Sequence, residues 1–224
     1  DIREEDTVPG YMVYWPQDRV KELEKAGDIG PIKVVLGSVH SRMPSIASVK
    51  VGDVVFPVTL VKKQLCVLAR LPVEHREPAF DYCIRELGEE HGALIPEGVA
   101  LEWVGGGGRH YWGCRTKRYD RPEDLPEGIR LVPLSEQVAK PHLKHQEPFN
   151  CCSQWAVWGD HGSSIRPRPI PPELAPDLRF GHPKSKEKAL RFDKNGGILA
   201  MSLQSTRRMS PETLAVFEGL FAGD

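Results

Sequence analysis

The sequence predicts an α+β fold in which a meander of β-strands is flanked by helices. Two runs rich in β-branched and apolar residues, Val54–Val61 and Leu65–Leu71, surround the short polar turn Lys62–Lys63–Gln64. This arrangement is typical of a β-hairpin. Two further segments, Gln17–Ala26 and Pro211–Phe221, carry apolar residues at helical spacing. Together these segments indicate a mixed α+β class.

The amino-terminal part is predicted to begin with a strand and to continue into a helix. Tyr11–Trp15 is a β-like run that Pro16 ends. Gln17–Ala26 then places apolar residues three positions apart among charged ones, and Gly27 closes the predicted helix. A single helical turn is expected over Ser45–Val49.

The central part is predicted to contain a helix, a hairpin and a further strand. Glu77–Gly92 carries apolar residues at helical spacing. Ala100–Val104 and His110–Cys114 flank four consecutive glycines and are interpreted as the arms of a hairpin. The glycines, Gly105–Gly108, lack the Gly-Lys-Ser/Thr signature of a phosphate-binding loop, so they are expected to form the hairpin tip. Ile129–Val132 is predicted to be a strand.

The last third of the chain is expected to be mostly extended and to end in a helix. Ser153–Val157 and Ile198–Leu203 are predicted strands. Arg166–Pro172 is expected to be extended, because its four prolines fix φ and disfavour helical neighbours. Ser210 followed by a proline is a typical helix start, so the final helix is expected over Pro211–Phe221.

Composition places the chain among globular proteins. Its 224 residues suffice for one substantial core, and 40% hydrophobic and 27% charged residues are ordinary values. No apolar run approaches the roughly 18 residues that span a bilayer, and Asp1–Asp6 is polar and acidic, unlike a signal peptide. The cysteines number five, which argues against a disulfide framework. We therefore expect a cytoplasmic protein with no membrane partner.

Charge is unevenly distributed along the chain, although the net charge is only −1. Between Glu74 and Glu102, eight acidic residues stand against two basic ones. Between Gly162 and Ser210, ten basic residues stand against four acidic ones. The basic part is a candidate phosphate-facing surface. The alternative is that these lysines and arginines lie in solvated loops.

A polar loop and a glycine-aspartate strand opening occur together between Val34 and Leu71. An apolar run leads into the loop Gly37–Arg42, a short turn follows, and Val51–Gly52–Asp53 opens the hairpin. This combination resembles the EVE domain of the PUA-like superfamily, which is related to ASCH and YTH domains. That family joins a base-facing loop of the form x-N-x-x-A-R to a Val-Gly-Asp strand. The chain departs from the form at Val39–Arg42, which lacks the usual Asn and Ala, and one extra residue precedes Val-Gly-Asp.

The end of the chain extends the resemblance. Ile165–Leu178, Met201–Ser205 and Met209–Phe221 match, in order, the proline-bearing strand, the late strand and the capped final helix of EVE-like domains. The resemblance implies one PUA-like (EVE-type) twisted β-barrel over residues 8–224, with flanking helices and a large insertion. Residues 81–150 are expected to form that insertion, as a subdomain or an extended loop region. The side chains expected in the core are Val51, Val55, Leu60, Val67 and Leu214.

The resemblance also implies a site that holds a base. Modification-reading domains extrude a nucleotide into a pocket with aromatic walls, and polar groups bind the base edge while basic groups contact phosphates. The expected base-binding residues are Trp15, Ser38, His40, Arg42, Trp155 and Trp158. The expected phosphate-binding residues are Arg166, Arg168, Arg207 and Arg208. Each tryptophan has the alternative of core packing, and each loop histidine or arginine that of a solvated side chain.

Metal binding and catalysis have weaker signals. Six histidines and cysteines in or beside the insertion suit zinc, but no pair has the Cys-x2-Cys spacing of a zinc knuckle. They are His110, Cys114, His142, His145, Cys151 and Cys152. Cys151 with His161 has no readable activating arrangement. The Gly37 loop lacks the lysine and glutamate of the Gly-x-Lys-x-x-Glu-x-Arg signature of ASCH domains, some of which are hydrolases. We expect no cofactor and no catalytic residue, and zinc binding stays open.

The sequence therefore favours a nucleic-acid-binding module that reads a modified base, with DNA as the first expectation and RNA as the second. A nuclease partner or fused effector of a defence system is the expected protein partner. Two alternatives stay open. One is an enzyme that acts on a nucleoside or small polar substrate in the same pocket. The other is a protein-interaction module that binds no nucleic acid.

Overall fold

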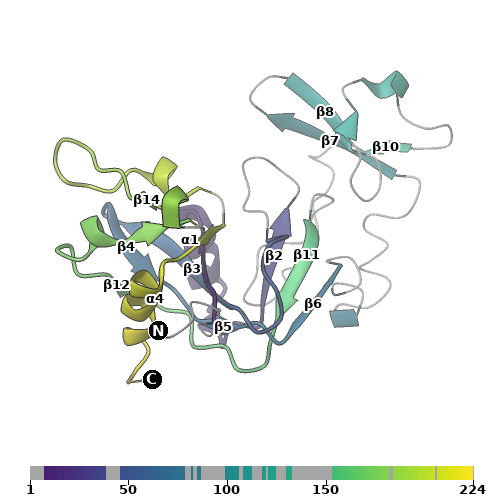
Figure 1. Ribbon diagram of the computed structural model, residues 1–224. Coiled ribbons are helices and arrows are strands. Elements are labelled where there is room, and N and C mark those ends of the chain that lie inside the picture. Colours follow the sequence, from purple (N-terminus) through teal and green to yellow (C-terminus); the bar gives the residue numbers. More distant parts are fainter. Residues whose placement is uncertain are drawn as a thin grey trace.

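The described part of the computed structural model consists mainly of strands, with few helices (Figure 1). The residues that the structure describes are 8–38, 46–78, 82, 85–86, 99–105, 108–112, 118–119, 121–124, 130–132, 153–181, 184–204 and 206–223. They form a mixed α+β architecture, which confirms the predicted class. The strand pairings within these residues do not close into a barrel.

The largest sheet is organised around the strand β3. It contains β1 (Gly10–Tyr14), β3 (Val54–Val61), β4 (Gln64–Val67), β5 (Leu71–Pro72), β12 (Arg168–Pro169) and β15 (Arg207–Arg208). Their order is β12-β4-β3-β1-β15, and β5 also pairs with β3. The β1–β3 pair is parallel, with Tyr11 opposite Val55, whereas β3–β4 and β1–β15 are antiparallel. Parallel neighbours need a long connection rather than a tight turn, and here the connection contains a helix and another strand.

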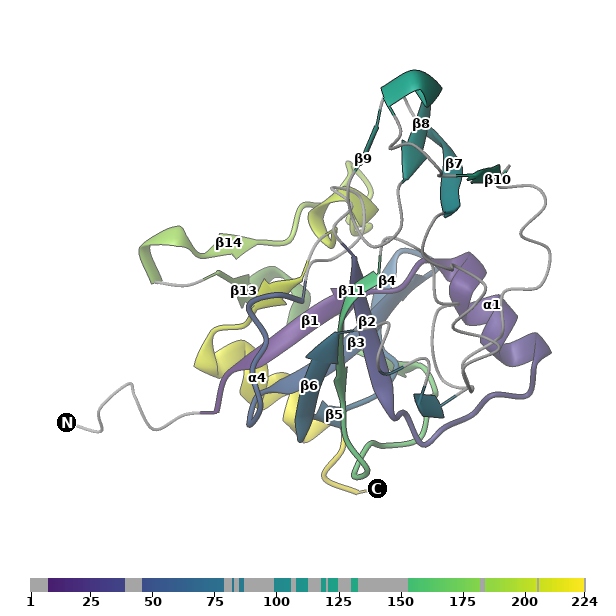
Figure 2. The ribbon, with the colours of Figure 1, turned by 90° about the vertical axis from the view of Figure 1, so that its right-hand side faces the viewer.

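A smaller sheet stands beside the first (Figure 2). It consists of β2 (Val34–Ser38), β11 (Ser153–Trp158) and β6 (His75–Pro78), in the order β2-β11-β6. Both pairings are antiparallel. In the sequence, β6 precedes the central part of the chain and β11 follows it. The pairing of β11 with β6 therefore places the two ends of that part side by side.

Two hydrophobic clusters cover the two faces of β3. One contains Val55 together with Val35 of β2 and Val157 of β11, so it fills the space between the two sheets. The other contains Phe56 and Val58 and is covered by the carboxy-terminal segments. Side chains alternate along a strand, so β3 supplies both clusters, and its residues from Val54 to Leu60 are all buried.

The two helices pack where the apolar periodicity predicts. The helix α1 (Gln17–Lys25) buries Val20 and Leu23 in the cluster between the sheets. The helix α4 (Pro211–Gly219) buries Phe217 against Phe56, with ring centroids 5.6 Å apart. Ser210 caps α4, because its hydroxyl oxygen accepts a hydrogen bond from the Thr213 amide at 3.2 Å.

Shorter elements complete the description. Between β12 and α4 the chain forms the 3₁₀-helices η4 (Ala175–Asp177), η5 (Lys184–Lys186) and η6 (Ala200–Ser202), and the paired strands β13 (Arg179–Phe180) and β14 (Lys188–Ala189). A separate sheet of order β10-β7-β8-β9 contains β7 (Val99–Gly105), β8 (Gly108–Trp112), β9 (Arg118–Tyr119) and β10 (Arg130–Val132), with η2 at Pro122–Asp124. The hairpin predicted around the four glycines is β7–β8.

Three local predictions are wrong for identifiable reasons. The predicted helix from Glu77 cannot begin there, because Glu77 lies in β6 and pairs with Ala156. The predicted strand Ile198–Leu203 is instead a single bridge at Ile198 followed by η6. The run Leu65–Leu71 divides into β4 and β5, and the break lies opposite Pro57, which has no amide hydrogen to donate to a neighbouring strand.

The expected core is confirmed at three positions. Val55, Leu60 and Val67 are buried. Val51 is 60% exposed because it lies in the turn before β3, so its prediction is wrong. Leu214 is half-buried at the edge of the second cluster. No helix in the described ranges has both the length and the apolar character to cross a membrane.

We expect Phe217→Ala to lower the free energy of unfolding by about 3–5 kcal/mol, because it leaves a cavity against Phe56 in a closely packed core. Urea denaturation measures this change. Met201→Ala is the matched control, because Met201 is 71% exposed and surface changes stay within about 0.5 kcal/mol. Equal losses in the two variants would contradict the assignment of the second cluster.

Candidate nucleic-acid interface

The two tryptophans of β11 lie on opposite faces of their sheet. Trp155 packs against the cluster between the sheets. Trp158, three residues later, contacts residues on the other face. Residues an odd number of positions apart in a strand point to opposite sides, so one pocket cannot be walled by both rings. The expectation that Trp155 and Trp158 share a base pocket is therefore wrong for this geometry.

Trp158 is surrounded by side chains of this chain. It is the last residue of β11 rather than a loop residue. The His75 ring stacks on it with centroids 3.9 Å apart and an interplanar angle of 25°, and the Arg85 guanidinium lies 4.7 Å from its ring. Its indole N–H donates to Glu77 Oε1 at 2.6 Å. These contacts already use the indole donor and a ring face.

Trp155 lies on the strand that pairs with the residues opening the predicted loop. It is half-buried, and the Arg76 guanidinium lies 3.9 Å from its ring centroid. Trp155 pairs with Gly37, and Ser153 pairs with Ser38. Ser38 is the last residue of β2, so the strand pairing places Trp155 beside the start of the expected pocket loop. His40 and Arg42 lie outside the described residues, and their roles stay predictions.

Trp15 belongs to the core. It is 2% exposed in the cluster between the sheets, and its amide donates to Val58 O at 2.8 Å. A base could not stack on it without opening that cluster, so its prediction as a base-binding residue is corrected to a packing role.

Of the zinc candidates, His110 lies in β8, whereas Cys114, His142, His145, Cys151 and Cys152 lie outside the described residues. Within the described ranges no group of histidine, cysteine and acidic side chains is arranged to hold a metal.

Arg168 also has a structural position. It is 7% exposed, and its guanidinium donates to Leu68 O at 3.0 Å and to Ser164 O at 3.3 Å. The same group lies 4.3 Å from the Phe221 ring. A buried guanidinium held by carbonyl oxygens and an aromatic ring stabilises the fold. The prediction of Arg168 as a phosphate contact is therefore corrected.

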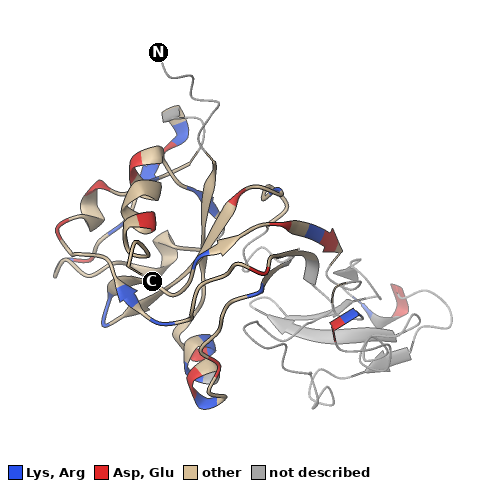
Figure 3. Ribbon diagram, turned by 90° about the horizontal axis from the view of Figure 1, so that it is seen from below, with Lys and Arg blue, Asp and Glu red and all other residues tan. Residues whose placement is uncertain are grey.

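The predicted phosphate-binding arginines do not form one surface. Arg168 lies in β12 and the pair Arg207–Arg208 in β15, at opposite ends of the strand order β12-β4-β3-β1-β15. Four strand spacings separate these ends, roughly 19 Å in a flat sheet. Arg166 is exposed just before β12, on the Arg168 side. Figure 3 shows basic segments scattered over several elements rather than gathered along one stripe.

Arg207 and Arg208 line a cavity of about 490 Å³ between β15 and the β13–β14 pair. We call this the basic cavity. Its wall is formed by Tyr11, Ser48, Phe180, Gly181, Lys186, Lys188, Thr206, Arg207 and Arg208. None of its four cationic side chains forms an ion pair with an acidic side chain of the described ranges.

The strand pairing explains why the basic cavity forms at this edge. Arg208 lies opposite Tyr11 in the β1–β15 pair, and Gly181 N donates to Arg208 O at 2.7 Å. Gly181 has φ of 136°, and a Cβ there would lie 2.5 Å from Lys186 O. Only glycine fits this close approach, which holds the backbone at Lys186 next to the residue bonded to Arg208 O.

The electrostatics of the basic cavity favour an anion. Burial lowers the pKa of Arg207, because desolvation disfavours the charged guanidinium. Burial, and then the nearby Asp53 carboxylate, raise the pKa of the Tyr11 phenol, so Tyr11 stays a neutral donor. The Thr206 hydroxyl is buried at the wall with no hydrogen-bond partner. Arg207 donates to Gln204 O at 3.3 Å, but the four cations have no acidic partner and the Thr206 hydroxyl no partner among the described residues, and a bound anion would satisfy both.

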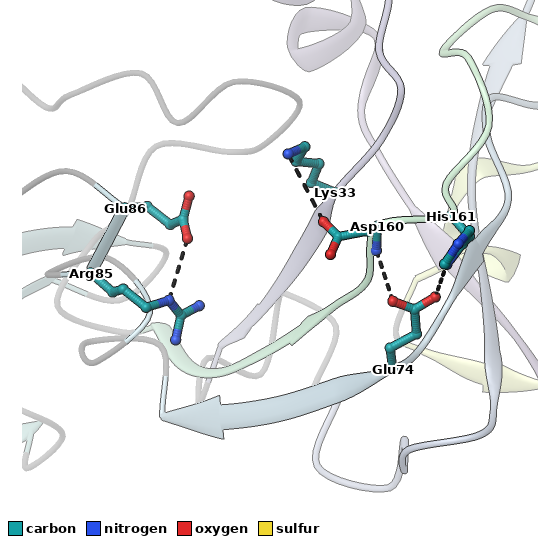
Figure 4. Close-up of polar contacts among 6 residues, drawn as sticks. All are labelled: Lys33, Glu74, Arg85, Glu86, Asp160 and His161. Atoms are coloured by element: carbon teal, nitrogen blue, oxygen red, sulfur yellow. Dashed lines mark hydrogen bonds and ion pairs between the residues drawn. The ribbon is translucent and has the colours of Figure 1, made fainter.

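A second polar group lies at one end of the smaller sheet, where β2 and β6 begin and β11 ends (Figure 4). One Glu74 carboxylate oxygen contacts His161 Nδ1, and the other accepts from the Asp160 amide at 2.9 Å. Lys33 lies 4.0 Å from the Asp160 carboxylate. The hydrogen bond to Glu74 raises the pKa of His161. His161 is exposed and its partner is a carboxylate, so this group fastens the chain after β11 to the residue before β6.

Comparison of the chain with models of protein families found no match, and comparisons with curated proteins and with solved structures found none either.

Of the nine residues that line the basic cavity, Arg207 and Arg208 were predicted as phosphate-binding residues. Lys186 and Lys188 belong to the basic stretch that was a candidate phosphate-facing surface, whereas Tyr11 and Thr206 were missed. A two-residue strand such as β15 carries no periodicity, so its pairing with β1 cannot be read from sequence. The alternation in β1 places Tyr11 and Val13 on one face. This alternation was the one feature of the sequence from which the position of Tyr11 could have been predicted.

We expect Arg168→Ala to lower the free energy of unfolding by about 1–3 kcal/mol, because Leu68 O and Ser164 O each lose one of their donors and the Phe221 ring loses the guanidinium beside it. Chemical denaturation measures this loss. Arg191→Ala removes an exposed arginine and should change stability by no more than about 0.5 kcal/mol. If Arg168→Ala left stability unchanged and weakened nucleic-acid binding, the structural assignment would be refuted.

We expect NMR titration to give His161 a pKa above that of the same residue in Glu74→Gln. Because the folded-state pKa is raised, this contact stabilises the protein below the unfolded pKa and is lost as pH rises through the folded one. Glu173→Gln, which removes an exposed carboxylate, should leave the titration unchanged. Identical curves for wild type and Glu74→Gln would show that the contact does not form in solution.

Proposed function

We propose that this protein is a nucleic-acid-binding module that contacts phosphates at the basic cavity. The observation that carries the proposal is a set of four cations around one cavity, Lys186, Lys188, Arg207 and Arg208, none of which forms an ion pair with an acidic side chain among the described residues. Such side chains supply affinity for nucleic acid by replacing the counterions of the phosphates. A net charge of −1 makes this local concentration of positive charge stand out from the rest of the chain.

The resemblance to EVE domains supports the finer form of the proposal. In this form the fold is a PUA-like twisted barrel and the bound nucleic acid is DNA with a modified base. Ser48 lines the basic cavity and closely follows the expected pocket loop. His40 and Arg42 of that loop remain the base contacts that the resemblance implies. Trp155, beside Ser38 through the β2–β11 pairing, is the aromatic residue best placed to assist.

The side chains that line the basic cavity argue against the alternative of a protein-interaction module. Protein interfaces are depleted of lysine in their cores, and this cavity carries Lys186 and Lys188. A phosphate-rich ligand satisfies these groups better than an apolar surface would. The expected nuclease partner or fused effector stays part of the proposal, because the described residues offer a binding surface rather than a cleavage site.

Fluorescence anisotropy with labelled DNA and RNA oligonucleotides, modified and plain, tests the proposal over a salt series. We expect Arg208→Gln to weaken binding to modified and plain DNA about equally and to reduce the slope of log K against log salt by about one. The slope falls because one phosphate contact is removed.

Lys21→Gln is the control for that measurement. It also removes one positive charge, but from an exposed position on α1 outside the basic cavity, so affinity and slope should stay at wild-type values. Binding that is insensitive to salt, or equal losses in Arg208→Gln and Lys21→Gln, would rule out the basic cavity as the phosphate site.

A further inference from the structure

We propose that the basic cavity binds a phosphate monoester, the terminal phosphate of a nucleotide or of a nucleic-acid end, in preference to an internal phosphodiester. This inference rests on the proposed function, because it specifies which phosphate of a nucleic acid the cavity selects. Four features of the cavity support it: its charge, its free hydroxyl, its volume and the origin of its cations.

The charge of the basic cavity exceeds what one internal phosphate would neutralise. Lys186, Lys188, Arg207 and Arg208 line it. Asp53 is the acidic side chain whose charge acts on both Tyr11 and Arg208, and it leaves an excess of positive charge. A phosphodiester carries a single negative charge, whereas a phosphate monoester carries about −1.5 to −2 near neutral pH. The monoester therefore matches the cavity better.

The hydrogen-bond donors match a group with three terminal oxygens. The Thr206 hydroxyl is buried without a partner, and the Tyr11 hydroxyl donates only a long bond of 3.4 Å to Ser48 O. Together with the guanidinium of Arg208, these donors come from neighbouring strands and the turn beside them. A monoester offers three strong acceptor oxygens, one more than an internal diester, so it can satisfy the hydroxyls as well as the cations.

The size and wall of the basic cavity suit one nucleotide unit. Its volume of about 490 Å³ falls in the range of roughly 300–1,000 Å³ that is common for small-ligand sites. A phosphate group alone would leave most of it unfilled. The rings of Tyr11 and Phe180 form part of the wall, and they provide apolar contact for a sugar or base attached to the phosphate.

The cations reach the basic cavity from two separate segments. Arg207 and Arg208 lie in β15, while Lys186 ends η5 and Lys188 lies in β14. The bond from Gly181 N to Arg208 O connects the two segments. A dianion bound in the cavity would therefore have cations of both segments around it.

Direct binding of two matched oligonucleotides tests the inference. The probes are two single-stranded oligonucleotides of the same sequence, one with a 5′-phosphate and one with a 5′-hydroxyl, each labelled at the other end. We expect the phosphorylated probe to bind at least about tenfold more tightly, because a charge-assisted contact is added. Arg208→Gln and the double variant Lys186→Gln/Lys188→Gln should bring the ratio close to one. Lys21→Gln should leave it unchanged.

The double variant guards against a folding defect, since Lys186 and Lys188 are exposed and their replacement leaves the β1–β15 pairing intact. Equal affinities for the two probes, with binding still salt-dependent and weakened by Arg208→Gln, would overturn the inference and leave the proposed function standing.

A nucleoside 5′-monophosphate and the matching nucleoside, titrated by calorimetry, separate the remaining outcomes. Binding of the monophosphate alone, lost in Arg208→Gln, would support the cavity assignment even if no oligonucleotide bound, in which case the proposed function would fail. If neither the monophosphate nor the phosphorylated probe bound, the inference would be refuted.

Discussion

The burial of β3 on both faces is the constraint on which the rest of the structure depends. Its residues from Val54 to Leu60 are buried, with Val55 on one side and Phe56 and Val58 on the other. A strand of this kind needs a cover on each face and a partner on each edge. The smaller sheet with α1 provides one cover, and α4 with the carboxy-terminal segments provides the other.

The parallel pairing of β1 with β3 connects the buried strand β3 to the basic cavity. β1 lies on one edge of β3, so its own free edge takes β15. This pairing brings Arg208 opposite Tyr11, although the two residues are far apart in sequence. Burial then lowers the pKa of Arg207 by desolvation, a cost that an anion in the cavity would offset. We therefore attribute the proposed affinity for phosphate to the pairing of β15 with the free edge of β1.

The sequence predicted the elements that have their own periodicity and missed those made by long-range pairing. The hairpin at Lys62–Lys63 and the two helices could be predicted, because alternation, helical spacing and the Ser210 cap are local signals. The role of Pro57 in dividing β4 from β5 and the pairing of Glu77 in β6 depend on neighbours distant in sequence. For the site, charge identified Arg207 and Arg208, but only the strand order showed that Arg168 lies at the other end of the sheet. Strand alternation could already have separated Trp155 from Trp158.

An NMR titration of the labelled protein with a 5′-phosphorylated oligonucleotide tests the central claim, that the basic cavity is where nucleic acid binds. We predict that the largest changes in chemical shift occur at the backbone amides of Tyr11, Gly181 and Arg208. The chemical shift of the Trp158 indole N–H, which donates to Glu77, should stay unchanged. The largest changes at the indole signals of Trp155 and Trp158, with the three amides unchanged, would contradict the account.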